Sequence, residues 1–194
     1  RRERVSRHDP RLVTTKLARG LPRLRTPVAG YLIEGVVRKA QRADFRIVAY
    51  TIQSDHLHLL VEADDDAAYS SGMRGLMRRL VHGLNGLWKR KGCVFPERFH
   101  DRVLRSLRQV RNALRYVLNN HLKHGHGFAV REGRVVGDPY SSARWFDGWR
   151  EGAHARSGED GRRPAVVRGG WKLGVGWRRY ALISVREVPG AVAA

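Results

Sequence analysis

Residues 55–62, DHLHLLVE, constrain this chain more than any other stretch, because two histidines interrupt an apolar run. On a β-strand successive side chains point to opposite faces, so His56 and His58 project side by side from one face. Leu60 shares that face, and the apolar residues between them face the other side. Two neutral imidazoles on a rigid strand suit adjacent ligands of one metal ion. Histidines bonded to the backbone or exposed to solvent would give the same pattern, so a metal site needs further residues from elsewhere.

The charge balance predicts a polyanionic partner. The 194 residues include 38 Lys and Arg against 18 Asp and Glu, a formal net charge of +20. Nucleic acid is favoured over a membrane, because no stretch approaches the ~20 apolar residues of a spanning helix. Cys93 is the only cysteine, which excludes an internal disulfide and every cysteine-based zinc site. The sequence, which begins without Met, carries no secretory signal pattern, so we expect a reducing, cytoplasmic setting.

Hydrophobic periodicity predicts an α+β fold. The order is strand, helix, strand, strand, helix, strand, helix, which is a βαββαβ series with one extra helix. Such a series is typical of a ferredoxin-like antiparallel sheet with helices packed on it. The predicted strands are 12–18, 45–53, 56–63 and 99–106, and the predicted helices begin at Pro27 and span 67–90 and 107–124.

We expect one domain over residues 12–147, between a basic N-terminal arm (1–11) and a basic, aromatic C-terminal tail (148–194). Aromatic residues among arginines at 171–180 fit base stacking and phosphate contact. They equally fit packing of the tail on the domain.

The last predicted helix offers residues that could complete a site. Tyr116 and Asn120 are four residues apart, so on a helix they are neighbours on one face. If that face lies over the histidines, a phenol, an amide oxygen and two imidazoles converge. Three neutral ligands, His56, His58 and Asn120, would leave a divalent ion its full charge, which suits a Lewis acid acting on a phosphodiester. Tyr116 would then be the nucleophile, although a tyrosine at a helix–sheet contact often packs there with only its hydroxyl in water.

These residues carry a resemblance to a known family. His56-Leu57-His58 resembles the His-hydrophobic-His motif of the insertion-sequence-200-like single-tyrosine transposases, particularly the branch associated with repetitive extragenic palindromes (REPs). The segment from Tyr116 to Asn120 is similar to the helix that supplies that branch's catalytic Tyr and metal-binding Asn. The resemblance spans residues 10–147. The chain departs from the family at Asp55, where Asn is common, and at His121, where Pro is frequent.

The resemblance implies an HUH-nuclease (Rep-like) fold and metal-dependent cleavage and rejoining of single-stranded DNA beside palindromic hairpins. Tyr116 would attack the phosphorus, leaving a free 3′ hydroxyl and a 5′-phosphotyrosine. Mg²⁺ or Mn²⁺ held by His56, His58 and Asn120 would assist. The resemblance also implies a bacterial, nucleoid-associated protein, either a monomer or a homodimer.

Basic side chains near the predicted site are candidates for binding the DNA backbone, although solvated arginines give the same pattern. They are Arg98, His100, Arg102, Arg105, Arg108, Arg111, Arg115 and Lys123. The histidine-rich segment 121–126 matches no closed zinc spacing, so a DNA-facing end is favoured over a second metal site.

Two other functions stay open. A non-catalytic DNA- or RNA-binding module would gain support if Tyr116 did not face the histidines. A replication-initiator or relaxase-like nickase would share the chemistry, but the sequence has no Gly-x-x-x-x-Gly-Lys phosphate loop.

Overall fold

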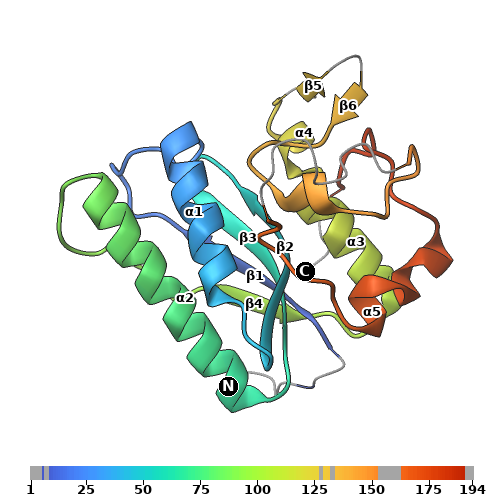
Figure 1. The fold of residues 1–194 in the computed structure, drawn as a ribbon, viewed down its shortest axis with the longest axis horizontal. Helices are drawn as coiled ribbons and strands as arrows, with labels where there is room; N and C mark the ends of the chain where they lie inside the picture. The colour runs from blue at the N-terminus through green and yellow to red at the C-terminus, as the bar shows by residue number, and fades with distance from the viewer. Residues whose placement is uncertain (1–5, 7–8, 127–128, 132–133, 153–162, 191–194) are drawn as a thin grey trace.

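A computed structural model describes residues 6, 9–126, 129–131, 134–152 and 163–190. Most of the predicted N-terminal arm therefore lies outside the described residues. The elements follow the predicted order, with a small hairpin and short helices added after the last long helix (Figure 1). They are β1 (Arg11–Lys16), α1 (Pro27–Ala40), β2 (Phe45–Ile52), β3 (His56–Ala63), α2 (Asp66–Leu87), β4 (His100–Val103), α3 (Leu107–Leu118), α4 (Asn120–Lys123), β5 (Ala129–Arg131), β6 (Arg134–Val136), η1 (Ser142–Trp145), α5 (Trp171–Gly174) and η2 (Gly176–Tyr180).

Strands β1 to β4 form one sheet in the order β2-β3-β1-β4, and every neighbouring pair is antiparallel. This arrangement confirms the predicted α+β class and the antiparallel sheet. The two central strands, β3 and β1, pair so that Thr14 lies opposite His58 and Lys16 lies opposite His56. The register therefore fixes which β1 side chains stand beside the two histidines.

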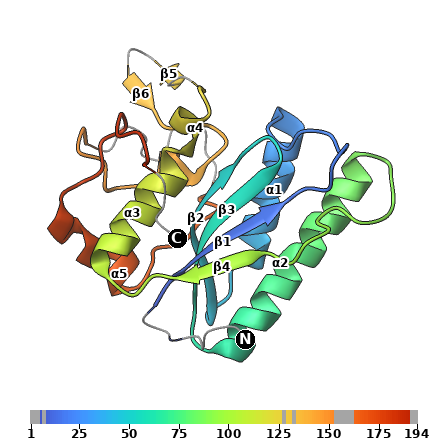
Figure 2. The same ribbon diagram turned by 180° about the vertical axis from the view of Figure 1, so that it is seen from behind.

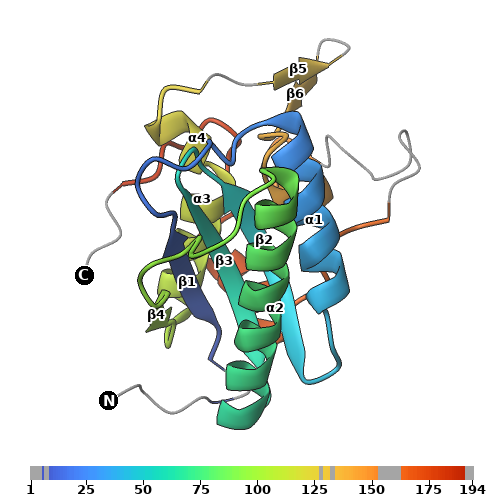
Figure 3. The same ribbon diagram turned by 90° about the vertical axis from the view of Figure 1, so that its left-hand side faces the viewer.

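The two faces of the sheet are covered by different layers (Figures 1 and 2). Helices α1 and α2 cover one face, where Leu57, Leu59 and Val61 of β3 belong to a core shared with both helices. Helix α3 and the C-terminal segment cover the other face, where Leu60 belongs to a second core. The predicted alternation of β3 is confirmed, because the residues between the histidines face α1 and α2. Figure 3, with α2 nearest the viewer, shows the sheet between α2 and α3.

Local sequence sets where the long helices begin. The Thr26 side chain accepts a hydrogen bond from the Ala29 amide and Pro27 opens α1, as the sequence predicts. The Asp65 side chain caps α2 in the same way, through the Ala68 amide. Gly72 brings α2 close to β2, because a Cβ at this position would collide with the Phe45 ring.

Helix α2 ends at Leu87 rather than at residue 90 as predicted, and Lys89 adopts a left-handed backbone (φ 50). Strand β4 is likewise shorter than the predicted 99–106. The Leu104 amide bonds to the Pro10 carbonyl, and Ser106 caps α3 in a capping box with Gln109.

The predicted single helix over 107–124 is wrong in its second half. Helix α3 ends at Leu118, Asn119 leaves helical geometry (φ −105, ψ 14), and α4 begins at Asn120. The physical reason lies outside the helix, since the Asn119 side-chain amide donates to the Ser184 and Glu187 carbonyl oxygens. Backbone acceptors in the C-terminal segment thus hold the residue at which the helix breaks.

The described part of the C-terminal tail packs on the domain. Trp177 is fully buried and Trp149 nearly so, and both belong to the core between the sheet and α3, together with Leu173 and Ile183. The Trp177 indole donates to the Leu173 carbonyl. By contrast, Trp171 is 58% exposed, so only part of this aromatic segment faces solvent. Within the part of the chain that the structure describes, no helix is long and apolar enough to cross a membrane.

The C-terminal segment should therefore be part of the cooperative fold. Trp177→Ala removes a fully buried side chain and should lower the free energy of unfolding by about 3–5 kcal/mol. Trp171→Ala, at an exposed position of the same segment, is the matched control and should change it by less than about 1 kcal/mol. Denaturant melts of both variants measure the difference, and equal effects would contradict the packing described here.

Candidate active site

Strand β3 presents His56 and His58 together on the α3 face of the sheet. Their ring centroids lie 4.7 Å apart with the planes at 75°. His58 is buried at 5% exposure, whereas His56 is half-buried. The predicted pairing of the two imidazoles is therefore present, with one ring more accessible to solvent than the other.

Each histidine is held through its Nδ1 atom. His56 Nδ1 donates to Asp55 Oδ1 at 2.7 Å, and His58 Nδ1 lies 2.8 Å from the Thr14 hydroxyl oxygen. When Nδ1 carries the proton, Nε2 keeps the lone pair that can bind a metal ion or accept a hydrogen bond. The Asp55 carboxylate thus holds the His56 ring through the nitrogen that would not bind a metal ion.

Helix α3 brings Tyr116 to the same place. The Tyr116 hydroxyl lies 3.3 Å from His58 Nε2, and the ring centroids are 4.9 Å apart. The Lys123 Nζ atom lies 5.7 Å from the centre of the Tyr116 ring. Buried Val110, Leu114 and Val117 of α3 share a core with Leu60 of β3, and Tyr116 packs against the same core.

Electrostatics keep the histidine nearest to Tyr116 neutral. Burial, with the neighbouring His56, His124 and Lys123, lowers the pKa of His58 to about 3. At pH 7 the ring is therefore uncharged and its lone pair is available. The hydrogen bond from His56 lowers the pKa of the Asp55 carboxyl, so this group is an anion at the same pH.

His124 is a residue at the site that the sequence reasoning did not place there. Its ring centroid lies 5.8 Å from that of His56. Burial, followed by the nearby His56, lowers the pKa of His124. The sequence signal was the histidine-rich segment 121–126, in which His124 stands four residues after Asn120.

Asn120 is fully buried, and among the described residues neither atom of its side-chain amide has a hydrogen-bond partner. A buried, unpaired amide is costly and calls for a ligand or water to satisfy it. No hydrogen bond joins Asn120 to either histidine within the described chain. Over the same residues, no group of three or more His, Cys, Asp or Glu is arranged to hold a metal ion.

The candidate DNA-binding side chains separate into two groups. His100, Arg98, Arg105, Arg108 and Lys123 are exposed, and Arg102 is half-buried. In the β1–β4 register His100 lies opposite Thr14. Residues directly opposite each other share a face of the sheet, so His100 stands on the same face as the candidate site.

Arg111 and Arg115 are held inside the protein instead. Arg111 donates two hydrogen bonds of 2.9 Å to the Glu187 carboxylate, and Arg115 donates one of 2.9 Å. Arg111 also donates to the Ala181 and Leu182 carbonyls. Both guanidinium groups therefore fasten the C-terminal segment along α3 rather than presenting free cations to a phosphate backbone.

The ion pairs of Glu187 with Arg111 and Arg115 make the stability of the protein depend on pH. Burial disfavours the Glu187 anion, but hydrogen bonds from Arg111 and Arg115 outweigh it and lower the pKa of Glu187 to about 2, from an ordinary 4.5. A lowered folded-state pKa stabilises the protein above the unfolded pKa, and this contribution is lost as pH falls from about 4.5 to about 2.

Glu187→Gln should lower the free energy of unfolding at pH 7 by about 1–3 kcal/mol, because two guanidinium groups lose their anion. The variant should also lose part of the acid sensitivity between about pH 4.5 and 2. Thermal melts across this range measure both effects. Glu97→Gln, at a carboxylate 74% exposed, is the matched control. An identical pH profile of stability for wild type and Glu187→Gln would contradict a stabilising role of the Glu187 ion pairs.

Comparisons with known proteins support the resemblance drawn from the histidine and tyrosine motifs. No protein-family model matches the chain. A REP-associated tyrosine transposase of Escherichia coli (strain K12) is 27% identical over 99 residues, which are 48% of this chain and 54% of that protein. The chain thus aligns with about half the length of this curated relative.

The fold also matches a solved structure. A REP-associated tyrosine transposase bound to a REP hairpin superposes with a TM-score of 0.62 at 19% identity, covering 87% of this chain and 96% of that one. At this identity the match establishes a shared fold. Together with the sequence match, it supports the same transposase branch that the motifs indicated.

Proposed function

We propose that this chain is a metal-dependent, single-stranded DNA endonuclease and strand transferase that acts on DNA next to hairpins. The observation that carries the proposal is the 3.3 Å approach of the Tyr116 hydroxyl to Nε2 of a neutral, buried His58. A phenol beside paired imidazoles is an arrangement for nucleophilic attack at a phosphodiester. The E. coli relative is named a transposase, and the solved neighbour holds a REP hairpin, which supports hairpin DNA as the partner.

Tyr116 acts as the nucleophile in this proposal. As the phenolate it attacks the scissile phosphorus, so that an Oη–P bond forms and the bond to the 3′ oxygen breaks. The products are a 5′-phosphotyrosine and a free 3′ hydroxyl. A second 3′ hydroxyl can then attack the phosphotyrosine and release Tyr116, so no external energy source is needed. Lys123, close to the Tyr116 ring, would place a positive charge beside the bound phosphate.

His56, His58 and Asn120 would hold the divalent ion, Mg²⁺ or Mn²⁺. The residues fit this role, because both histidines are anchored through Nδ1 and the buried Asn120 amide has no partner among the described residues. When bound, the ion would polarise the scissile phosphate and stabilise the phenolate. Asp55 and Thr14 keep the two imidazoles in orientation whether or not the ion is bound.

The non-catalytic binding module is the weaker reading. It would have gained support if Tyr116 faced away from the histidines, but Tyr116 contacts His58. A replication-initiator or relaxase-like nickase would use the same residues, but its chemistry serves plasmid replication or transfer. The proposal implies action on palindromic hairpin DNA in the bacterial cytoplasm.

Covalent adduct formation tests the nucleophile. Labelled single-stranded DNA carrying a hairpin, incubated with wild-type protein and Mg²⁺ or Mn²⁺, should yield a protein–DNA adduct on a denaturing gel. Tyr116→Phe lacks the attacking oxygen and should lower adduct formation by at least about 10³-fold while leaving hairpin binding intact.

Tyr31→Phe, which removes the hydroxyl of an exposed tyrosine on α1, is the matched control and should keep full activity. An adduct that persists in Tyr116→Phe would assign the nucleophile elsewhere. Hairpin binding without any adduct or cleavage, across a broad set of hairpins, would favour the binding module.

Direct metal binding tests the ligand set without relying on catalysis. Asp55→Ala removes the carboxylate behind His56 and should weaken Mn²⁺ affinity by about 10–100-fold, measured by calorimetry on the DNA-free protein. His56→Ala and Asn120→Ala should weaken it further. Asp44→Ala, at an exposed carboxylate paired with Arg42, is the control. Unchanged Mn²⁺ affinity in all three site variants would overturn the assignment.

A further inference from the structure

A second concentration of positive charge lies on α2, which the candidate active site does not use. Residues 67–96 contain no Asp or Glu but include six Lys or Arg. One of these, Arg90, bonds to Asn85 and to the Cys93 carbonyl in the following loop. The remaining five cations are exposed, and with exposed His82 they form what we term the α2 cationic stripe: Arg74, Arg78, Arg79, His82, Lys89 and Lys91.

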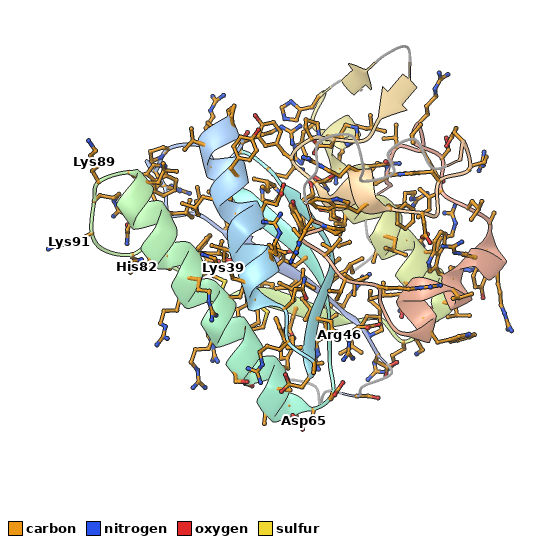
Figure 4. The ribbon with its side chains drawn as sticks, viewed as in Figure 1. Lys39, Arg46, Asp65, His82, Lys89 and Lys91 are labelled. Atoms are coloured by element: carbon orange, nitrogen blue, oxygen red, sulfur yellow. The ribbon has the colours of Figure 1, made fainter. Side chains whose placement is uncertain are left out.

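The stripe follows one face of the helix. Buried Met73, Leu76, Leu80 and Leu84 fix the face of α2 that packs on the sheet. Positions 74, 78 and 82 are each four residues apart and therefore line up on the opposite face. Figure 4 shows His82, Lys89 and Lys91 along α2 and the loop that follows it.

No carboxylate neutralises the stripe within the described chain. Other arginines of this half of the molecule have acidic partners, as in the Arg38–Glu34, Arg42–Asp44 and Arg46–Asp64 pairs. By contrast, none of the stripe residues makes an ion pair with a described residue. Like charges four residues apart on a helix repel each other, so a polyanion bound along this face would relieve that repulsion.

The stripe is separated from the candidate active site by the sheet. Helix α2 covers the face that buries Leu57 and Leu59, whereas His58 and Tyr116 lie on the α3 face. In Figures 1 and 3 the two helices stand on opposite sides of the sheet. A DNA strand at Tyr116 therefore leaves the stripe free for another segment.

The chemistry of the stripe fits a phosphate backbone rather than bases. It contains no Phe, Tyr or Trp on which a base could stack, since Trp88 is half-buried against the α1–α2 core. From Arg74 to the helix end at Leu87 it extends about 20 Å, at 1.5 Å per residue. This length matches about six base pairs of duplex, at 3.4 Å of rise each.

We infer that the α2 cationic stripe binds the phosphate backbone of duplex DNA without reading its sequence, on the face opposite Tyr116. This inference rests on the proposed function only for the identity of the polyanion, which is DNA. The protein would thus hold a duplex on α2 while a single strand occupies the face with Tyr116.

The salt dependence of duplex binding tests this inference. A labelled blunt duplex without a hairpin is titrated with Tyr116→Phe protein at several salt concentrations, in its parent form and with Arg74→Gln, Arg78→Gln and Arg79→Gln combined. Each lost phosphate contact removes about 0.9 from the slope of log K against log salt. The triple variant should therefore lose about 2–3 units of slope and bind at least about tenfold more weakly at low salt.

Three exposed arginines of the C-terminal segment, outside the aromatic stretch 171–180, give a control with the same change of net charge: Arg163→Gln, Arg168→Gln and Arg186→Gln combined. This control should keep the parent slope. Equal losses in both triple variants, or no loss in the α2 variant, would overturn the inference. Binding to vesicles of anionic phospholipid that is tighter than binding to the duplex, and lost in the α2 variant alone, would overturn it as well.

The outcome is independent of catalysis, because the parent already lacks the attacking hydroxyl. A failure of adduct formation in the wild-type protein would remove the proposed function and leave the duplex measurement valid. Conversely, the wild-type protein could form the adduct while the α2 triple variant binds duplex normally. That result would support the proposed function and refute duplex binding by the α2 cationic stripe.

Discussion

Burial of β3 on both faces of the sheet is the constraint on which the rest of the structure depends. Its odd-numbered apolar residues pack against α1 and α2, and this fixes the register in which the strand can sit. A shift by one residue would turn Leu57 and Leu59 to the α3 face and bury the histidine pair among the leucines of the α1–α2 core. The free energy of the α1–α2 core therefore orients His56 and His58, although neither histidine contributes to that core.

The second layer is built differently, because the helix that carries Tyr116 is held by the C-terminal segment as well as by the sheet. Along α3, Arg111, Arg115 and Asn119 are four residues apart, and each bonds to the segment 181–187. Tyr116 lies between two of these anchors. The same contacts hold Asn119, where α3 ends, and His124 beyond this break meets His56. A segment far from the motifs in sequence thus shapes the surroundings of the nucleophile.

The distribution of charge follows this division into layers. The net charge alone suggests that all arginines are available to bind DNA. Some of them form internal ion pairs instead, as Arg111 does with Glu187 and Arg25 with Asp138. Others stay exposed without acidic partners, and those on α2 lie across the sheet from Tyr116. The overall excess of +20 therefore does not describe one continuous basic surface.

The sequence by itself determined the order of the elements and the face on which His56 and His58 project. These follow from periodicity, caps and strand alternation, which act over a few neighbouring residues. Only the tertiary structure decided that α3 breaks at Asn119, that His124 joins the site, that Arg111 and Arg115 bind Glu187, and that Trp149 and Trp177 are core residues. Each of these depends on contacts between segments distant in sequence, and local propensity carries no information about which distant carbonyl or carboxylate a side chain will meet.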